Sequence, residues 1–253
     1  MKKVTLKNVN LGEFSKFIST LSSLSKGKSV YFTIDNDSVY SDSYIETRTL
    51  IKSLRFNLSD FCENETIDNT IKFTFFSGKK VKDALSYLRE DSLSIIVSYD
   101  EYDGENYCSY ITLTDGILKI TLNGANPGLV EFANVPKEVI GDLISVDNAH
   151  SNFRITTSEL TQIKSLLKLD TNEHITFVVE SDSVYIKSEG SFNRAIEGTN
   201  LEVTSNGEYP VSKDLIPMLE NDIYDVYPQD DQIIMKSIDG KIVNVVSLVD
   251  LTE

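Results

Sequence analysis

Residues 30–40 read VYFTIDNDSVY, and residues 175–185 read ITFVVESDSVY. Phe32 matches Phe177, and the tetrapeptide DSVY at 37–40 recurs at 182–185, all at one offset of 145 residues. In each copy, apolar and β-branched residues flank a polar tip, which predicts two short strands joined by a turn. Self-similarity at a fixed offset indicates that a structural unit is duplicated in the chain.

The order of predicted elements around this hairpin also repeats. Apolar residues at spacings of three and four predict a helix over 11–26 before the first copy and one over 158–170 before the second. Shorter helices are predicted over 78–90 and 211–220, and both contain a Lys-Asp pair. The pairs Asp115-Gly116 and Asp239-Gly240 each predict a later hairpin.

Each half therefore reads helix, hairpin, two strands, short helix and three strands. This order predicts an α+β protein of two tandem similar domains, each with two helices packed on antiparallel sheets. The domains are expected at residues 1–122 and 153–253. Residues 123–152 contain two prolines and three glycines without a clean period, and we expect them to form an interdomain connector.

Composition restricts the class of protein. The chain has 253 residues, of which 40% are apolar and 25% charged, as in a soluble globular protein. No apolar run is long enough to cross a bilayer, and no apolar segment follows the charged N-terminus as in a secretory signal. Cys62 and Cys108 lack metal-ligand spacing and are expected to be buried, reduced thiols. These features predict a cytoplasmic protein (host cytoplasm if the chain is viral) that is not secreted and does not bind membranes.

The net charge of −15 is unevenly distributed. Residues 1–89 carry 14 Lys and Arg against 10 Asp and Glu, a net charge of +4. Residues 90–253 carry 10 against 29, a net charge of −19. A strongly acidic chain argues at first sight against a nucleic-acid partner, but this distribution allows a basic surface on part of the molecule.

No catalytic constellation is apparent. The chain has two histidines, His150 and His174, and it lacks a glycine-rich phosphate loop, an H-E-x-x-H motif and a nucleophile elbow. The acidic run over 100–105 has its glycine out of register for a calcium loop, and we expect a solvated hairpin tip. The sequence therefore predicts no catalytic residue, no metal, no cofactor and no enzymatic activity.

Basic residues lie on all four predicted helices. The apolar face of each helix is expected to pack on a sheet. Any one of them is most often a solvated side chain, but four helices with similar positive faces suggest a surface that follows phosphates without reading bases. The predicted DNA-binding residues are Lys16, Lys79, Lys80, Lys82, Arg89, Lys164, Lys168 and Lys213.

A duplicated domain of two helices and a long sheet, with acidic total charge and basic helices, resembles the DNA sliding clamps. The likeness is greatest to the trimeric ones, the proliferating cell nuclear antigen and the clamps of T4-like phages. It covers nearly the whole chain and is carried by SELTQIKSLLKL at 158–169, the repeated hairpin and the closing VNVVSLVDL. The resemblance implies a homotrimeric ring around double-stranded DNA that tethers a replicative DNA polymerase and is loaded by a separate ATPase.

The resemblance also implies two protein contacts. A partner peptide would bind a groove beneath the connector, and the matching positions are Tyr44, Leu129, Val130, Phe132, Leu248, Val249 and Leu251. Subunits would join edge to edge, with residues 117–122 meeting the strand near 192–197. The interface residues are then Ile117, Lys119, Ile120, Phe192, Arg194 and Ile196.

Two other readings fit the pattern less well. A β-rich viral structural or assembly protein could use the same repeat but would have no reason for four basic helix faces. A monomeric processivity or transcription factor could share the clamp fold without forming a ring. The groove residues could also serve only to pack the connector onto the sheets.

Overall fold

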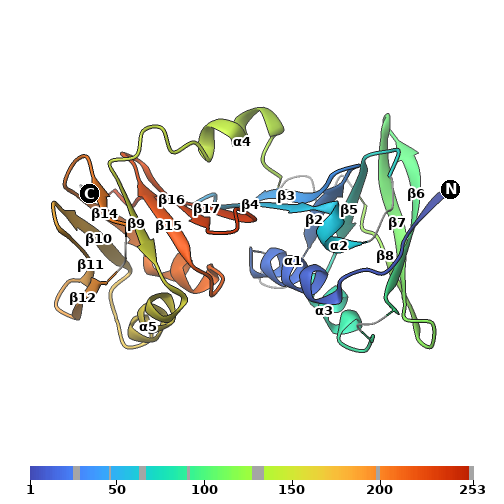
Figure 1. Cartoon of the computed structure of the whole chain (residues 1–253), viewed down its shortest axis with the longest axis horizontal. Helices are drawn as coiled ribbons and strands as arrows, with labels where there is room; N and C mark the ends of the chain where they lie inside the picture. The colour runs from blue at the N-terminus through green and yellow to red at the C-terminus, as the bar shows by residue number, and fades with distance from the viewer. Residues whose placement is uncertain are drawn as a thin grey trace. The chain divides into compact units, whose positions relative to one another are not determined.

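The computed structural model describes residues 1–24, 29–45, 47–62, 67–89, 92–126, 134–197 and 200–250. The chain forms two compact units (Figure 1). The first unit comprises Met1–Glu46 and Ser53–Pro136, and the second comprises Thr47–Lys52 and Lys137–Glu253. A short segment from the first half of the chain is therefore part of the second unit.

The first unit is built mainly of strands. Its elements are β1 (Lys2–Leu6), α1 (Leu11–Leu24), β2 (Val30–Ile34), β3 (Ser38–Tyr44), β4 (Leu50–Asn57, shared with the second unit), α2 (Leu58–Phe61), β5 (Ile71–Phe75), α3 (Gly78–Leu85), β6 (Ser94–Tyr102), β7 (Glu105–Thr114) and β8 (Lys119–Asn123). The strand order is β1-β6-β7-β5-β2-β3-β4, and β8 pairs with β7. Strands β5 and β7 run parallel, whereas β1 with β6, β2 with β3, β2 with β5, β6 with β7 and β7 with β8 are antiparallel.

Aromatic side chains fill the core of the first unit. Phe17 of α1 is fully buried, and its ring meets those of Phe32, Phe56 and Phe61 edge to face at centroid distances of 5.4–5.7 Å. Phe32 also stacks on Phe73 at 4.6 Å. These geometries are the ones that aromatic pairs prefer. The apolar stripe predicted from the helical spacing of 11–26 is therefore the face that α1 buries.

The second unit contains two sheets. Its elements are α4 (Lys137–Leu143), β9 (Ser151–Ile155), α5 (Thr157–Leu167), β10 (His174–Glu180), β11 (Ser183–Ser188), β12 (Phe192–Ile196), β13 (Glu202–Val203), β14 (Gly207–Ser212), the 3-10 helix η4 (Lys213–Met218), β15 (Tyr224–Pro228), β16 (Gln232–Ser237) and β17 (Ile242–Ser247). One sheet has the order β12-β11-β10-β14, and the other runs from β4 through β17-β16-β15-β9 to β13.

Local sequence signals set the ends of several elements. Thr156 and Glu159 form a capping box at the start of α5, since each side chain accepts a hydrogen bond from the other residue's backbone N–H. Gly116 and Gly240 have φ values of 85° and 72° in the turns after β7 and β16. Both hairpins predicted from Asp-Gly pairs are confirmed.

Several predicted bounds were wrong. The helix expected over 78–90 ends at Leu85, and the one expected over 211–220 is a 3-10 turn that begins only at Lys213. Pro217 lies inside that turn and cannot donate a backbone hydrogen bond, which disfavours an α-helix there. Strands β1, β9 and β14 and helix α4 were not predicted, and α4 lies within the expected connector.

Gly141 offers a direct test of the helical state of α4. A Cβ built on Gly141 meets no atom within 4 Å, and the residue lies inside the helix. Gly141→Ala should raise the free energy of unfolding by up to about 1 kcal/mol, because alanine loses less backbone entropy in a helix. Urea denaturation followed by circular dichroism measures the change.

Gly240→Ala is the matched control, because φ is positive there. It should lower the unfolding free energy by about 1–2 kcal/mol. A loss of stability in Gly141→Ala similar to that in Gly240→Ala would contradict the helical assignment of α4.

Candidate nucleic-acid interface

Helix α3 is positioned by its apolar face and by one glycine. Val81, Ala84 and Leu85 are buried, and the Ser77 hydroxyl caps the first turn by accepting a hydrogen bond from the backbone N–H of Lys80. A Cβ at Gly78 would lie 2.1 Å from the Ser22 hydroxyl oxygen on α1. Only glycine therefore lets the start of α3 approach α1 this closely.

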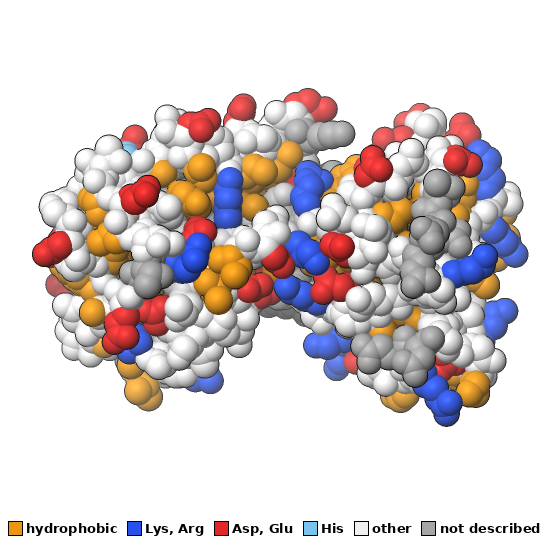
Figure 2. Space-filling model, viewed as in Figure 1, with side chains coloured by type: hydrophobic (Ala, Val, Ile, Leu, Met, Phe, Trp, Pro, Cys, Tyr) orange, Lys and Arg blue, Asp and Glu red, His pale blue; other side chains and the backbone are white. Residues whose placement is uncertain are grey.

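The opposite face of α3 is basic. Lys79, Lys80 and Lys82 are exposed, and Arg89 is exposed just beyond the helix. Asp83 is the one acidic residue within α3. Basic and acidic side chains are interspersed on the face of the molecule drawn in Figure 2. A short helix with three lysines and one carboxylate, followed by an exposed arginine, is thus a local exception in an acidic chain.

The other predicted DNA-binding residues differ in exposure. Lys16 on α1 is half-buried, and Lys168 at the end of α5 is exposed. Lys164 donates hydrogen bonds from its ammonium to the Leu219 carbonyl at 2.6 Å and the Asn221 side-chain oxygen at 2.7 Å, and burial lowers its pKa. Lys213 donates to the Asp170 carbonyl at 2.8 Å. The ammonium groups of Lys164 and Lys213 thus bind protein oxygens, unlike the exposed cations of α3.

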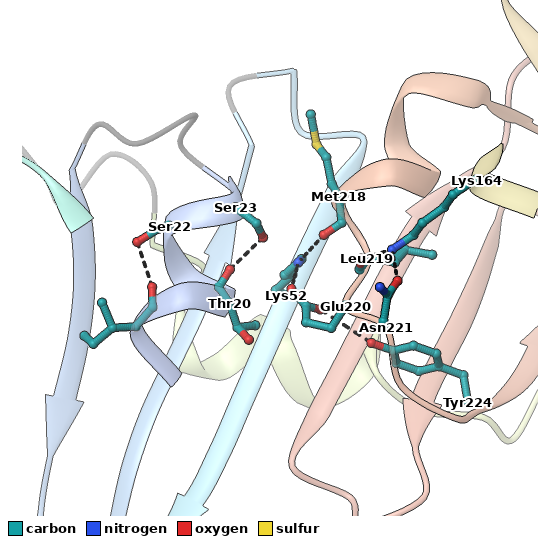
Figure 3. A network of polar contacts seen from close by, with 11 residues as sticks. Thr20, Ser22, Ser23, Lys52, Lys164, Met218, Leu219, Glu220, Asn221 and Tyr224 are labelled. Carbon is teal, nitrogen blue, oxygen red and sulfur yellow. Dashed lines mark hydrogen bonds and ion pairs between the residues drawn. The ribbon is translucent and has the colours of Figure 1, made fainter. Parts of the chain in front are cut away.

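A buried lysine forms an ion pair in the second unit. The Lys52 side chain is fully buried, and its ammonium donates to the Met218 carbonyl at 2.6 Å and to the Glu220 carboxylate at 2.5 Å (Figure 3). Burial lowers the pKa of Lys52, while the neighbouring Glu220 raises it. Lys52 was not among the predicted site residues. In a strand, residues 50, 52 and 54 point to the same face of the sheet. The apolar Leu50 and Leu54, which are both fully buried, were the signal in the sequence that Lys52 is buried with them.

Part of the predicted partner groove falls outside the described residues, namely Leu129, Val130, Phe132 and Leu251. Tyr44 is half-buried at the end of β3. Leu248 and Val249 are half-buried, and their backbone N–H groups donate to the carbonyls of Asp231 and Pro210. Val249 is thereby held against the outer edge of β14.

The predicted subunit contacts lie on two sheet edges. Among the described residues, β8 pairs only with β7, and β12 pairs only with β11. On and beside β8, Ile117 and Lys119 are exposed and Ile120 is half-buried. On β12, Phe192 and Arg194 are half-buried and Ile196 is buried. Both strands therefore leave one row of backbone groups available for pairing.

The described part of the chain contains no group of three or more His, Cys, Asp or Glu side chains able to hold a metal. The acidic run over 100–105 forms the exposed tip of the β6–β7 hairpin, with positive φ at Asp103 and Gly104. Cys62 and Cys108 are buried free thiols, as predicted, and burial raises the pKa of Cys108. None of the helices described here is long and apolar enough to span a membrane.

No protein-family model matches the chain. No curated protein matches it by sequence. Solved structures match over almost its full length. A PCNA2–PCNA3 complex from Sulfolobus tokodaii shares 13% identity at a TM-score of 0.68, covering 97% of this chain and 99% of its own. PCNA from Thermococcus kodakaraensis shares 13% sequence identity at a TM-score of 0.71, and the match covers 98% of this chain and 100% of that chain. The Proliferating Cellular Nuclear Antigen from Entamoeba histolytica shares 12% sequence identity at a TM-score of 0.75, and the match covers 97% of this chain and 98% of that chain. The predicted fold is confirmed: this is a PCNA-type sliding-clamp fold of α+β class.

The Lys52–Glu220 pair can be tested by replacing one or both partners. Lys52→Met should lower the free energy of unfolding by about 3 kcal/mol, because it leaves the Glu220 carboxylate without its cation. This loss of stability is at the low end of the range for breaking a buried ion pair, because the Glu220 side chain is 16% exposed. Urea denaturation gives the value.

The double variant Lys52→Met/Glu220→Leu should recover most of that loss, because both charges are removed together. If it is as unstable as the single variant, the stability at this position comes from the hydrogen bond to the Met218 carbonyl, which both variants lose, and not from the ion pair.

Proposed function

We propose that this protein is a DNA sliding clamp, a ring of identical subunits that encircles duplex DNA and tethers a replicative DNA polymerase. The observation that carries the proposal is the exposed basic face of α3 in a chain of net charge −15 with a PCNA-type fold. The protein would act as a scaffold that catalyses no reaction itself and needs no cofactor.

The chemistry of α3 suits a contact that slides. Lysine and arginine attract phosphates at any sequence, because the phosphate backbone carries no base information. Several weak contacts of this kind allow the protein to move along the duplex with a low barrier. Elsewhere the excess of carboxylates would repel DNA and so favour binding on the basic face.

The phosphate contacts are expected to be uneven between the two units. Lys79, Lys80, Lys82 and Arg89 supply most of the exposed charge, with Lys16 and Lys168 as secondary contacts. The ammonium groups of Lys164 and Lys213 would first have to leave their carbonyl partners. We therefore propose that α3 makes the largest contribution to DNA contact.

Polymerase and a clamp-loading ATPase are the proposed protein partners, and a homotrimer is the proposed assembly. Tyr44, Leu248 and Val249 would contribute to a groove for a short partner peptide, together with residues 129, 130, 132 and 251. The open edges of β8 and β12 favour a heterologous contact between copies, which can close into a ring.

Light scattering behind a sizing column tests the assembly. A mass of three times the 28.4 kDa of one chain is expected. A monomer at all concentrations would favour the monomeric processivity or transcription factor. A dimer or an open-ended series of larger species would favour a structural protein.

The α3 surface can be tested with a charge-matched pair of variants. Lys79→Gln/Lys80→Gln/Lys82→Gln should reduce DNA-dependent stimulation of the polymerase. The salt dependence of duplex binding should also weaken, by about 0.9 in the log–log slope for each phosphate that the variant no longer neutralises. The fold should be retained, because all three side chains are exposed.

The control Lys2→Gln/Lys3→Gln/Lys7→Gln removes the same charge at exposed positions on and after β1. It should leave both measurements close to those of the unaltered protein. Equal reductions in the two triple variants would show that total charge matters and that the position of α3 does not.

A further inference from the structure

An apolar cluster lies on one face of the sheet that runs from β4 through β17-β16-β15-β9. It consists of Ile234 on β16 and of Val243 and Val245 on β17, and all three side chains are buried. Ile234 is directly opposite Val245 across the two strands, so these side chains point to the same face. Aliphatic side chains on a sheet face stay dry only where another segment covers them.

The cover comes from the chain segment that contains α4. Ile144 and Val146, just after α4, pack against the apolar cluster, and both are half-buried. Figure 1 draws α4 on the side of this sheet opposite to α5. Residues 137–149, which we call the strap, therefore lie over the face that α5 leaves uncovered.

Two glutamines hold the strap in place. The side-chain amide of Gln229 donates to the Ser145 carbonyl at 2.8 Å, and that of Gln232 donates to the Leu143 carbonyl at 3.2 Å. Both glutamines come from the β15–β16 hairpin. The last carbonyls of a helix have no partner within the helix, so these amides satisfy the end of α4 and the residues after it.

The strap has little stability of its own. Helix α4 has seven residues, and an isolated helix of this length is not stable in water. Gly141 weakens it further, because glycine loses more backbone entropy in a helix than other residues do. Among the described residues, Ile144 and Val146 are the contacts of the strap with the apolar cluster. A segment held by few contacts opens locally without unfolding of the whole domain.

We propose that the strap is releasable and that the apolar cluster beneath it binds a short apolar peptide of a protein partner. Such a peptide would place two aliphatic side chains, separated by one residue, on the cluster, as Ile144 and Val146 do. Its backbone carbonyls would accept hydrogen bonds from Gln229 and Gln232. The closed strap would lower the apparent affinity in proportion to the fraction of molecules in which it is open. This inference rests on the scaffold function proposed above and adds a docking surface and its competitor within the same chain.

Thiol labelling tests whether the strap opens. Val245→Cys places a thiol under the strap, and Val246→Cys places one on the opposite face of the same strand. Both valines are buried, at 2% and 1% exposure, and the natural Cys62 and Cys108 are also buried. Under native conditions the thiol at 245 should react with dithionitrobenzoate about tenfold faster or more, because local opening costs less than unfolding. Equal rates at the two positions would overturn the proposal.

Variants of the strap should shift the labelling rate at position 245 in opposite directions. Ile144→Ser/Val146→Ser should raise it by about tenfold to a hundredfold, because two aliphatic side chains no longer favour the closed strap. Gly141→Ala should lower it by up to about fivefold, because alanine favours the helix. Val139→Ser, at a position of α4 that is 45% exposed, is the matched control and should leave the rate unchanged. The same rate in the double-serine variant and this control would contradict the strap.

A synthetic peptide with the sequence of residues 137–149 tests the docking surface. Added at millimolar concentration to a protein that carries Val245→Cys with Ile144→Ser/Val146→Ser, it should slow the labelling, because it takes the place of the loosened strap. The same peptide with serine at positions 144 and 146 should not slow it. No protection, or equal protection by the two peptides, would overturn the docking surface.

The labelling does not depend on assembly, so failure of the strap and failure of the clamp can be told apart. A mass of three chains with equal labelling at 245 and 246 would leave the clamp without a releasable strap. A monomeric mass with the expected labelling would leave an apolar docking surface on a protein that forms no ring.

Discussion

Backbone groups at the edges of the sheets impose the main constraint on this molecule, because an unpaired edge strand invites uncontrolled pairing. Two edges are protected within the chain. Lys2 and Lys3 place charge on β1, and the end of the chain donates a hydrogen bond to Pro210 on β14. Among the described residues, β8 and β12 each pair with a single strand, and Lys119 and Arg194 place charge on them as Lys2 and Lys3 do on β1. These two edges are the ones that the proposed ring would pair between copies.

The buried Lys52 shows how the first half of the chain is fixed into the second unit. Residues 47–52 belong to that unit, and Lys52 there binds the carbonyl of Met218, the last residue of η4, and the carboxylate of Glu220. A buried pair of this kind often adds little net stability, since desolvation offsets the attraction. Its effect is on specificity, because any displacement of β4 would leave a charge buried without a partner.

Much of the fold could be predicted from local patterns. Helical spacing identified the buried face of α1, where Phe17 and Ile18 are fully buried, and Asp-Gly pairs identified two hairpins. Contacts between segments far apart in the sequence could not be predicted from local patterns. The ammonium of Lys164 meets the Leu219 carbonyl 55 residues away, and no pattern near Lys164 indicates that contact. The basic face of α3 was predictable because helical period alone separates its buried and exposed residues.

The uneven distribution of charge along the chain fits the proposal that α3 makes the largest contribution to DNA contact. The first 89 residues, with a net charge of +4, contain α3 and its lysines, whereas the remainder carries −19. Uniform acidity would repel a polyanion, and uniform basicity would bind it over the whole surface. A basic helix held by Gly78 against α1, within a molecule of net negative charge, would concentrate the proposed attraction at α3. In the proposed clamp, restricting the attraction in this way would let a duplex be held without being bound tightly at any single position.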